Sequence, residues 1–363
     1  MTRQLRRRGF LAGVGAAAVA GCLGRAGSGT DTGETEVAPS GPPTAGRQLP
    51  LPMSPDQLSD AAVSGGPSKD GIPSIDDPSF VAAREAPADL APDDPVFGIV
   101  LDGEAKAYSQ KILAYHEICN DVVGGRPVSV TYCPLTGTAI GFERGRTTFG
   151  VSGRLVNNNL IMYDRATETW WPQMLSTAIP GAWNESPEIQ SLQHVPVVWT
   201  TWQRWRAAYP ETRLLSRETG YARNYENDPY GSYNPREGYY APSAKPLFPA
   251  LSEDDRLPPK AVVFGSRTSD GAAAVGKRHL RETGLVTGTL GGTPILAVYD
   301  PVLDTGHLYR NPDQRAFEYR DGTVVAEDGE SHEPDALPLK GLLAFDAMWF
   351  AWAGFYPDTT LYV

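Results

Sequence analysis

The sequence predicts a β-rich α+β protein made of two tandem copies of an antiparallel meander domain, each closed by a short Trp-rich helix. Three observations support this prediction: an internal repeat, many short apolar runs bounded by Gly, Pro and Asn, and a Trp-x-x-Trp segment in each half. The chain has 363 residues, of which 41% are hydrophobic and 10% aromatic. This composition is sufficient for a packed core and excludes a wholly disordered chain.

The repeat consists of two blocks that occur in the same order in both halves. The first block matches without a gap at an offset of 167 residues and shares mostly Gly, Pro and aromatic positions: Phe97-Gly98 with Phe264-Gly265, Gly124-Gly125 with Gly291-Gly292, and Tyr132 and Pro134 with Tyr299 and Pro301. The second block matches Trp202, Trp205, Tyr209 and Thr212 with Trp349, Trp352, Tyr356 and Thr359. We therefore expect two copies of one domain, at residues 76–218 and 261–363.

The first copy is expected to begin with two hairpins separated by a short helix. The sequence predicts strands at 96–101, 105–108, 127–133, 138–144, 147–151 and 160–163, and a helix at 110–115. Trp199, Trp202, Arg206 and Tyr209 have helical spacing, and Pro210 would end that helix. The tryptophans are therefore expected to form a packing face that both copies repeat.

The first 22 residues have the features of an export signal. Arg7-Arg8 forms a twin-arginine pattern before an apolar run rich in Ala and Gly, and Val19–Cys22 matches a lipobox. The apolar run is too short to span about 30 Å of hydrocarbon. We expect cleavage before Cys22, lipidation of that cysteine, and anchoring to the outer face of the cytoplasmic membrane.

Two further segments differ from the copies in composition. Residues 23–75 are rich in Gly, Ser, Thr, Pro and acidic residues, which predicts a disordered tether between the lipid and the folded part. Residues 219–260 contain six tyrosines among Pro, Asn and Gly, which predicts an ordered aromatic strap over one or both copies. A carbohydrate-binding surface is the alternative interpretation of the strap.

Charge and cysteine content exclude several classes of protein. Lys and Arg number 32 against 43 Asp and Glu, so the formal net charge is −11, and no basic stripe indicates nucleic-acid binding. Only seven of the basic residues are Lys, and the acidic, Arg-rich composition is typical of proteins from salt-adapted organisms. Three cysteines exclude a disulfide scaffold and a Cys-rich zinc module.

The two copies differ at a few polar and reactive positions. His116, Glu117, Cys119 and Cys133 occur in the first copy only, where the second has Thr283, Gly284, Val286 and Asp300. Reactive side chains confined to one copy of a repeat indicate a single site added to a shared scaffold.

Three long motifs resemble a known family. HEICNDVVGGRPVSVTYCPLTGTAIGFER, FGVSGRLVNNNLIMYDRATETWWPQ and WFAWAGFYPDTTLY are similar to the family called domain of unknown function 3179. The resemblance covers nearly all of residues 90–363 and implies a bacterial or archaeal, often exported protein, without an established activity. Many members have Cys-Pro-Leu-Cys where this chain has Cys133-Pro134-Leu135-Thr136, so the second thiol of a Cys-x-x-Cys pair is absent here.

Three interpretations of His116 and Cys133 stay open. They could hold copper or zinc, with Met162 or Asp164 as a further ligand. They could form a Cys-His pair, in which Cys133 is the nucleophile, His116 lowers its pKa and Glu117 or Asp121 orients the imidazole. They could also be packing residues without a chemical role. A disulfide between Cys119 and Cys133 would exclude the first two interpretations.

A second polar cluster follows in the first copy. Asn159, Asp164 and Gln173 are candidate binding residues at the rim of the site that Cys133 occupies, although turn chemistry also explains residues of these types. The common hydrolase, metalloprotease and nucleotide-binding motifs do not occur in the sequence.

From these features we expect a membrane-anchored lipoprotein with a binding or assembly role and a copper or zinc site in the first copy. The alternatives are a thiol-dependent enzyme and a protein that binds carbohydrate or a cell-surface polymer through its strap. The sequence leaves the question of enzymatic activity open.

Overall fold

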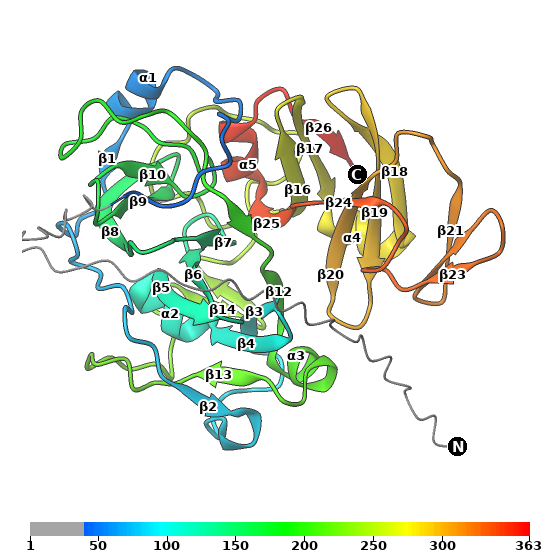
Figure 1. Cartoon of the computed structure of the whole chain (residues 1–363), viewed down its shortest axis with the longest axis horizontal. Coiled ribbons are helices and arrows are strands. Elements are labelled where there is room, and N and C mark those ends of the chain that lie inside the picture. Colours follow the sequence, from blue (N-terminus) through cyan, green and yellow to red (C-terminus); the bar gives the residue numbers. More distant parts are fainter. Residues whose placement is uncertain (1–39) are drawn as a thin grey trace, which may run out of the picture. The chain divides into compact units, whose positions relative to one another are not determined.

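Antiparallel strands dominate the structure, because the sequence alternates short apolar runs with tight Gly, Asn and Asp turns. The computed structural model describes residues 40–363, within which there are twenty-six strands and five α-helices of six or seven residues. The prediction of a β-rich α+β protein is confirmed (Figure 1). Within these residues, no helix has the length and apolar character that a membrane span requires.

The first half contains two sheets that follow the predicted hairpins. One sheet has the order β12-β3-β4-β13-β2, and its strands are β12 (Val198–Thr201), β3 (Pro95–Leu101), β4 (Glu104–Ser109), β13 (Arg213–Leu215) and β2 (Phe80–Ala82). The other has the order β11-β7-β6-β5, and its strands are β11 (His194–Val195), β7 (Thr138–Glu143), β6 (Arg126–Cys133) and β5 (Ile118–Val123). Helix α2 (Gln110–His116) connects β4 to β5.

The second half contains two sheets with similar strand orders. One has the order β25-β16-β17-β26, and its strands are β25 (Phe345–Met348), β16 (Val262–Thr268), β17 (Gly271–Gly276) and β26 (Thr360–Tyr362). The other has the order β18-β19-β20-β24, and its strands are β18 (Leu285–Leu290), β19 (Thr293–Asp300), β20 (Thr305–Arg310) and β24 (Lys340–Leu342). Helix α4 (Lys277–Thr283) connects β17 to β18.

Corresponding strands of the two halves also agree in register and direction. Phe97 pairs with Tyr108 in the first half, and Phe264 pairs with Val275 in the second. Phe264 follows Phe97 in the sequence by the same number of residues as Val275 follows Tyr108. Strand β13 runs parallel to β4, and β26 runs parallel to β17. The repeated sequence blocks thus occupy sheets of matching order and register.

A Gly-Trp-Thr contact recurs in both halves. A Cβ atom at Gly98 would overlap the ring of Trp205, and one at Gly265 would overlap the ring of Trp352. The indole of Trp205 donates a hydrogen bond to the Thr212 hydroxyl at 2.9 Å, and that of Trp352 donates to the Thr359 hydroxyl at 3.0 Å. Glycine is required here because the indole ring lies directly on the strand backbone.

The Trp-rich helices are α3 (Trp202–Ala208) and α5 (Trp349–Phe355), each followed by the parallel strand β13 or β26. The prediction that Trp199 lies on the helix is wrong, because Trp199 belongs to strand β12, where it pairs with Phe97. Four residues of helical spacing can also straddle a strand-to-helix junction, and residue spacing alone does not reveal the junction.

Each half contains one further sheet. Strands β1 (Val63–Ser64), β8 (Phe149–Val156), β9 (Asn159–Asp164) and β10 (Trp170–Pro172) form one sheet in the first half. Strands β21 (Phe317–Arg320), β22 (Thr323–Ala326) and β23 (Ser331–His332) form a three-stranded sheet in the second half. The first of these sheets covers the end of β6 that carries Cys133.

The structure differs from the predicted tether at residues 40–75. Helix α1 (Pro55–Asp60) begins with a capping box at Ser54 and Gln57, Leu58 is fully buried, and strand β1 pairs with β8. A few apolar side chains in a Gly- and Pro-rich segment can therefore join an existing core, although the composition alone predicts disorder. The expected lipobox at Val19–Cys22 lies outside the described residues.

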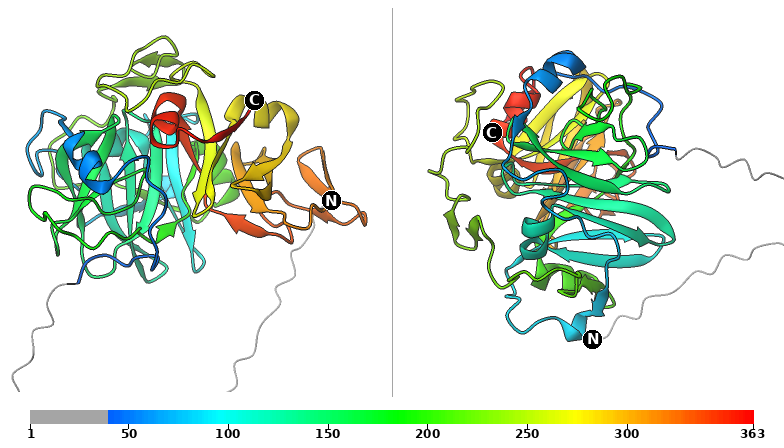
Figure 2. Two further views of the ribbon diagram at one scale, coloured as in Figure 1. Left: turned by 90° about the horizontal axis from the view of Figure 1, so that it is seen from above. Right: turned by 90° about the vertical axis from the view of Figure 1, so that its left-hand side faces the viewer.

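The segment from 219 to 260 is ordered and packs against both halves, since Arg256 also donates to the Thr359 carbonyl of the second half. It contains the hairpin of β14 (Gly231–Tyr233) and β15 (Arg236–Gly238), which lies in the yellow-green region at the top of the left-hand view of Figure 2. The Tyr239 hydroxyl donates to the Leu135 carbonyl at 2.8 Å, and the amide of Asn158 donates to the Phe248 carbonyl at 2.8 Å. We call residues 219–260 the strap.

The largest hydrophobic core contains residues from both halves. Buried side chains of β6–β9 in the first half, such as Phe142 and Met162, join Val263, Phe345 and the whole of helix α5. Cys133 belongs to this core, whereas Cys119 belongs to a separate core of the first half, and both thiols are free.

Candidate functional site

Cys133 lies at the end of β6, immediately before the turn that leads into β7. Its side chain is 1% exposed. The Leu160 amide donates to its sulfur at 3.4 Å, and the thiol lies 3.6 Å from the Asn158 carbonyl, to which it donates. The thiol therefore faces the tight turn between β8 and β9.

The pKa of Cys133 is raised to about 11 by burial and by the nearby Glu117 carboxyl group. The Thr136 hydroxyl opposes this shift through a hydrogen bond to the sulfur. Thr136 therefore contacts the sulfur, and it occupies the position at which many members of the resembling family have the second cysteine of Cys-Pro-Leu-Cys. The thiol is protonated at neutral pH and needs a base before it can act as a nucleophile.

Glu117 ends helix α2 in an unusual conformation. Its φ of 59° is in the left-handed region, which residues with a side chain rarely adopt. Its side chain is buried. Burial raises the pKa of Glu117 to about 8, so the group is largely protonated at neutral pH.

Lys260, at the end of the strap, is fully buried. Its amine lies 3.0 Å from the centre of the Tyr239 ring and 5.6 Å from that of Phe350. Among the described residues, no hydrogen-bond acceptor contacts the amine. Burial, with a smaller effect of the Arg236 charge, lowers the pKa of Lys260 to about 7. A large fraction of this amine is therefore neutral near pH 7.

Two tyrosines of the strap complete the site. Burial raises the pKa of Tyr230, and the Glu117 and Cys133 groups raise it further, as expected for neighbouring side chains. Burial and Cys133 act on the pKa of Tyr239 in the same direction. We call Glu117, Cys133, Tyr230, Tyr239 and Lys260 the thiol–amine cluster.

His116 is engaged elsewhere. Its Nδ1 atom lies 2.7 Å from the Pro73 carbonyl, and its Nε2 atom lies 2.5 Å from the Tyr225 hydroxyl. The imidazole is fully buried, and burial lowers the pKa of His116. Since both ring nitrogens have partners, the structure does not bring this imidazole into hydrogen-bonding contact with Cys133.

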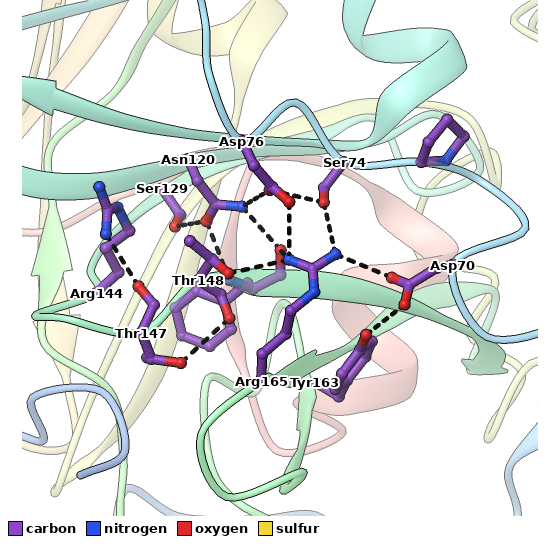
Figure 3. Close-up of polar contacts among 12 residues, drawn as sticks. Asp70, Ser74, Asp76, Asn120, Ser129, Arg144, Thr147, Thr148, Tyr163 and Arg165 are labelled. Atoms are coloured by element: carbon purple, nitrogen blue, oxygen red, sulfur yellow. Dashed lines mark hydrogen bonds and ion pairs between the residues drawn. The ribbon is translucent and has the colours of Figure 1, made fainter. Parts of the chain in front are cut away.

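An ion-pair network fixes the loop that carries Pro73. The Arg165 guanidinium contacts Asp70 and Asp76, each at 3.1 Å, and donates to the Ser74 hydroxyl at 3.1 Å (Figure 3). Asn120 of β5 donates to Asp76 at 2.6 Å, so the loop is attached to two sheets. His116 is thereby held by a rigid partner, which is typical of a structural histidine.

Asn159 and Gln173 form a saturated network behind the Cys133 turn. The Asn159 amide donates to the Thr136 hydroxyl at 3.1 Å and to the Gln173 side-chain carbonyl at 3.0 Å. Gln173 also accepts from Thr138 at 2.6 Å and donates to Thr131 at 2.9 Å. These buried amides hold the turn in place, and their hydrogen-bonding groups are already occupied.

Asp164 stabilises a turn at the end of β9. One carboxylate oxygen accepts from the Thr167 amide at 2.7 Å, and the other accepts from the Thr167 hydroxyl at 2.6 Å and the Trp171 indole at 3.0 Å. Within residues 40–363, no group of three or more His, Cys, Asp and Glu side chains has the geometry of a metal site.

Lys260, Tyr230 and Tyr239 were not predicted as site residues from the sequence. Lysine is rare in this chain, and Lys260 follows Pro258-Pro259 at the end of a segment rich in tyrosine. The small number of lysines is the only feature of the sequence that could have drawn attention to Lys260. Burial of the amine against an aromatic ring follows from tertiary packing across residues distant in sequence.

A pocket of about 250 Å³ lies between the two halves. Four pairs of corresponding positions contribute to its wall. Pro95 and Val262, like Gly137 and Asp304, are separated by the 167-residue offset of the first repeated block; Trp199 and Asp346, like Thr201 and Met348, have the same separation as Trp202 and Trp349. Residues of the strap, Tyr233, Asn234 and Arg236, close one side. We call this space the inter-half pocket.

Together, the fold and the thiol–amine cluster define a β-rich protein that holds a cluster of buried titratable side chains from its first half and its strap. The chain belongs to the family described as "Protein of unknown function (DUF3179)", whose model matches residues 69–359. No curated protein matches the chain, and no solved structure does.

Proposed function

We propose that residues 76–218 and 261–363 are two copies of one domain, and that the first copy carries the reaction site of a thiol-dependent enzyme. The matching strand orders, the common register and the recurring Gly-Trp-Thr contact support the duplication. At the positions of Glu117 and Cys133, the second copy has Gly284 and Asp300. The reactive groups are therefore specific to the first copy.

The observation that carries this proposal is the buried amine of Lys260, which lacks a hydrogen-bond acceptor among residues 40–363. An unpaired buried polar group is costly, and such groups concentrate at functional sites. Its lowered pKa lets the amine accept a proton near neutral pH. Glu117 is protonated in the same range and can donate one.

The cluster suits a small, uncharged substrate with an electrophilic carbonyl carbon. In the proposed step, the sulfur of Cys133 forms a bond to that carbon while the thiol proton passes to the Lys260 amine. The electron pair of the carbonyl π bond moves to its oxygen, which takes the proton of Glu117. Strap tyrosines cover the site and limit the access of water.

The test is the rate of alkylation by iodoacetamide in the native protein, resolved by peptide mass spectrometry. Cys119 is a matched internal control, because it is also buried and unpaired and its pKa is also raised by burial. We expect Cys133 to react at least about tenfold faster than Cys119. The Lys260 amine is unpaired, whereas Lys106, the lysine that acts on the pKa of Cys119, forms an ion pair with Asp121 and is not a free base.

Two variants separate the role of the base from that of the fold. Lys260→Met should slow alkylation of Cys133 at neutral pH to the rate of Cys119, whereas Lys245→Met, which replaces an exposed lysine of the strap, should leave it unchanged. Equal rates for the two cysteines in the folded wild type would overturn the proposal, as would full reactivity of Cys133 in Lys260→Met.

The inter-half pocket supports a second candidate function, binding of a saccharide. The indole of Trp199 forms part of its wall and is edge-on to the Tyr233 ring at a centroid distance of 5.2 Å. The pocket wall also contains the acidic residue Asp346. One of its carboxylate oxygens pairs with Lys277, and the other accepts no hydrogen bond from residues 40–363. An aromatic face and a free carboxylate oxygen together match the apolar and hydroxyl faces of a sugar ring.

Titration with glucose and with glucuronate, followed by calorimetry, tests this second function. Saturable binding that Asp346→Asn weakens about tenfold or more, and that the exposed Asp313→Asn does not change, is the expected result. No heat of binding for either sugar, or equal affinity of the Asp346→Asn variant, would refute it.

We further propose that the chain is exported and anchored at the outer face of the cytoplasmic membrane through Cys22. The support is the Arg7-Arg8 pair and the lipobox at Val19–Cys22. Replacing Cys22 by Ala should release the protein from the membrane fraction of cells. Unchanged membrane association of that variant would contradict the anchor.

A further inference from the structure

A second pocket, separate from both candidate sites, is lined by basic residues. It has a volume of about 220 Å³ and is bounded by the segment of Arg47 and Leu49, by strand β11, and by β16, β20 and β24 of the second half. Its cationic side chains come from four separate segments: Arg47, Arg267, Arg310 and Lys340.

The charge of this pocket is opposite to that of the chain. The chain has a formal net charge of −11, yet within residues 40–363 neither Asp nor Glu lines the pocket. The Asp270 carboxylate, the acidic partner of Arg310, is 3.9 Å from its guanidinium. Four cations converging in an acidic protein repel one another, and an anion between them would remove that repulsion.

Two buried donors in the pocket wall lack acceptors. The hydroxyl of Ser266, a residue that is 1% exposed, has no hydrogen-bond partner among the described residues. The same holds for one terminal nitrogen of Arg267, although the other donates to the Pro50 carbonyl at 3.3 Å. Buried donors without acceptors are rare and costly in folded proteins, and an anionic ligand would satisfy them.

His194 experiences the positive field of this region. Its Nε2 atom lies 2.8 Å from the Ser176 hydroxyl. Burial, followed by the charges of Arg267 and Arg47, lowers the pKa of His194 to about 3. The imidazole is therefore neutral at physiological pH and does not compete with a ligand for the basic groups.

We propose that this pocket binds a small oxyanion, such as phosphate, between Arg267, Arg310 and Lys340, with the Ser266 hydroxyl as an additional donor. Guanidinium groups and hydroxyls are the donors that tetrahedral oxyanions prefer. The oxyanion could be free in solution or be the phosphate of a lipid headgroup, since both present the same oxygens. This site is independent of the proposed reaction at Cys133.

Calorimetric titration of the full chain with inorganic phosphate, at constant ionic strength set by sodium chloride, tests the proposal. We expect saturable one-site binding and an increase in the thermal midpoint that equal ionic strength from chloride does not produce. The double variant Arg310→Gln/Lys340→Gln should weaken binding at least about tenfold, because it removes two charge-assisted contacts. The exposed Arg278→Gln variant, whose guanidinium contacts Glu282, is the matched control.

The absence of saturable phosphate binding to the wild type would overturn the proposal, as would equal affinity of the double variant and the control. Ser266→Ala provides a second check that retains every charge, and it should weaken phosphate binding without lowering the thermal midpoint of the free protein.

Vesicles identify the source of the oxyanion. If the ligand is a lipid headgroup, vesicles that contain phosphatidylglycerol should bind the wild type more strongly than the double variant, and inorganic phosphate should compete. If the ligand is free phosphate, both proteins should bind these vesicles equally while only the wild type binds inorganic phosphate.

Discussion

Glu117 and Gly284 end corresponding helices, α2 and α4, in the two halves, and both have positive φ angles, 59° and 75°. Glycine adopts this conformation at little cost, whereas a residue with a side chain is strained by about 1 kcal/mol. The first half therefore retains a strained, buried carboxyl group where the second half has the residue best suited to the backbone. Strain of this kind concentrates at functional sites.

The protonation of Glu117 should make stability depend on pH. Its pKa is about 8 in the folded protein, against an ordinary value of 4.5, so folding favours the protonated form. This contribution to stability is fully present below pH 4.5 and is lost progressively as the pH rises to about 8. Urea denaturation across this range should show the wild type losing stability relative to Glu117→Gln. A pH-independent difference between the two proteins would contradict the buried, protonated carboxyl.

Lys260 should have the opposite dependence on pH. Its pKa falls from 10.5 to about 7 on folding, so folding favours the neutral amine. Its contribution is most favourable above pH 10.5 and is lost as the pH decreases to about 7. The wild type should therefore gain stability relative to Lys260→Met as the pH rises through this range. Parallel stability curves for the two proteins would indicate an amine with an ordinary pKa.

His116 should contribute to stability and not to reactivity. Its replacement by Ala removes two hydrogen bonds of the buried imidazole: the Pro73 carbonyl loses its contact with the ring, and the Tyr225 hydroxyl keeps only its contact with Thr219. We expect a loss of about 1–3 kcal/mol in the free energy of unfolding. Alkylation of Cys133 in the folded variant should continue at the wild-type rate. A slower rate in His116→Ala would instead support the Cys-His pair that the sequence suggested.

The Gly-Trp contacts should be equally sensitive in both halves. A Cβ atom at Gly98 or at Gly265 would overlap an indole ring, so Gly98→Ala and Gly265→Ala should each lower the free energy of unfolding by about 1–3 kcal/mol or more. Gly341 is the matched control, because it also lies in a strand and has open space around its Cα. A loss of stability in only one of the two glycine variants would argue against equivalent packing.

Much of the strand pattern of the first half could be predicted from sequence. The turn at Asp102-Gly103 and the diglycine Gly124-Gly125 locate the first two hairpins, and each of these four residues has a positive φ angle. Local turn chemistry therefore determines where the chain reverses. The junction of β12 and α3 could not be predicted in this way. Strands and helices both bury apolar residues such as Trp199 and Trp202, so these tryptophans do not show where the strand ends and the helix begins.

The candidate site was only partly accessible to sequence reasoning. The difference between the two halves singled out Glu117 and Cys133. In the structure the Glu117 carboxyl group is near enough to raise the pKa of Cys133, because both residues depend on the local backbone of one hairpin and the helix before it. Lys260 is more than a hundred residues from Cys133 in the chain, and no periodicity connects them. His116 was expected beside Cys133, but the loop held by Arg165 occupies one of its ring nitrogens.

The shared core has a consequence for the order in which this chain is completed. Helix α5 and Phe345 lie among the side chains of β6–β9, which precede them by some two hundred residues of sequence. During synthesis, the first half cannot close its largest core until residues 345–356 have left the ribosome. Apolar side chains of the first half stay uncovered until then, so a chaperone that shields them during translation would benefit this protein more than one that acts after release.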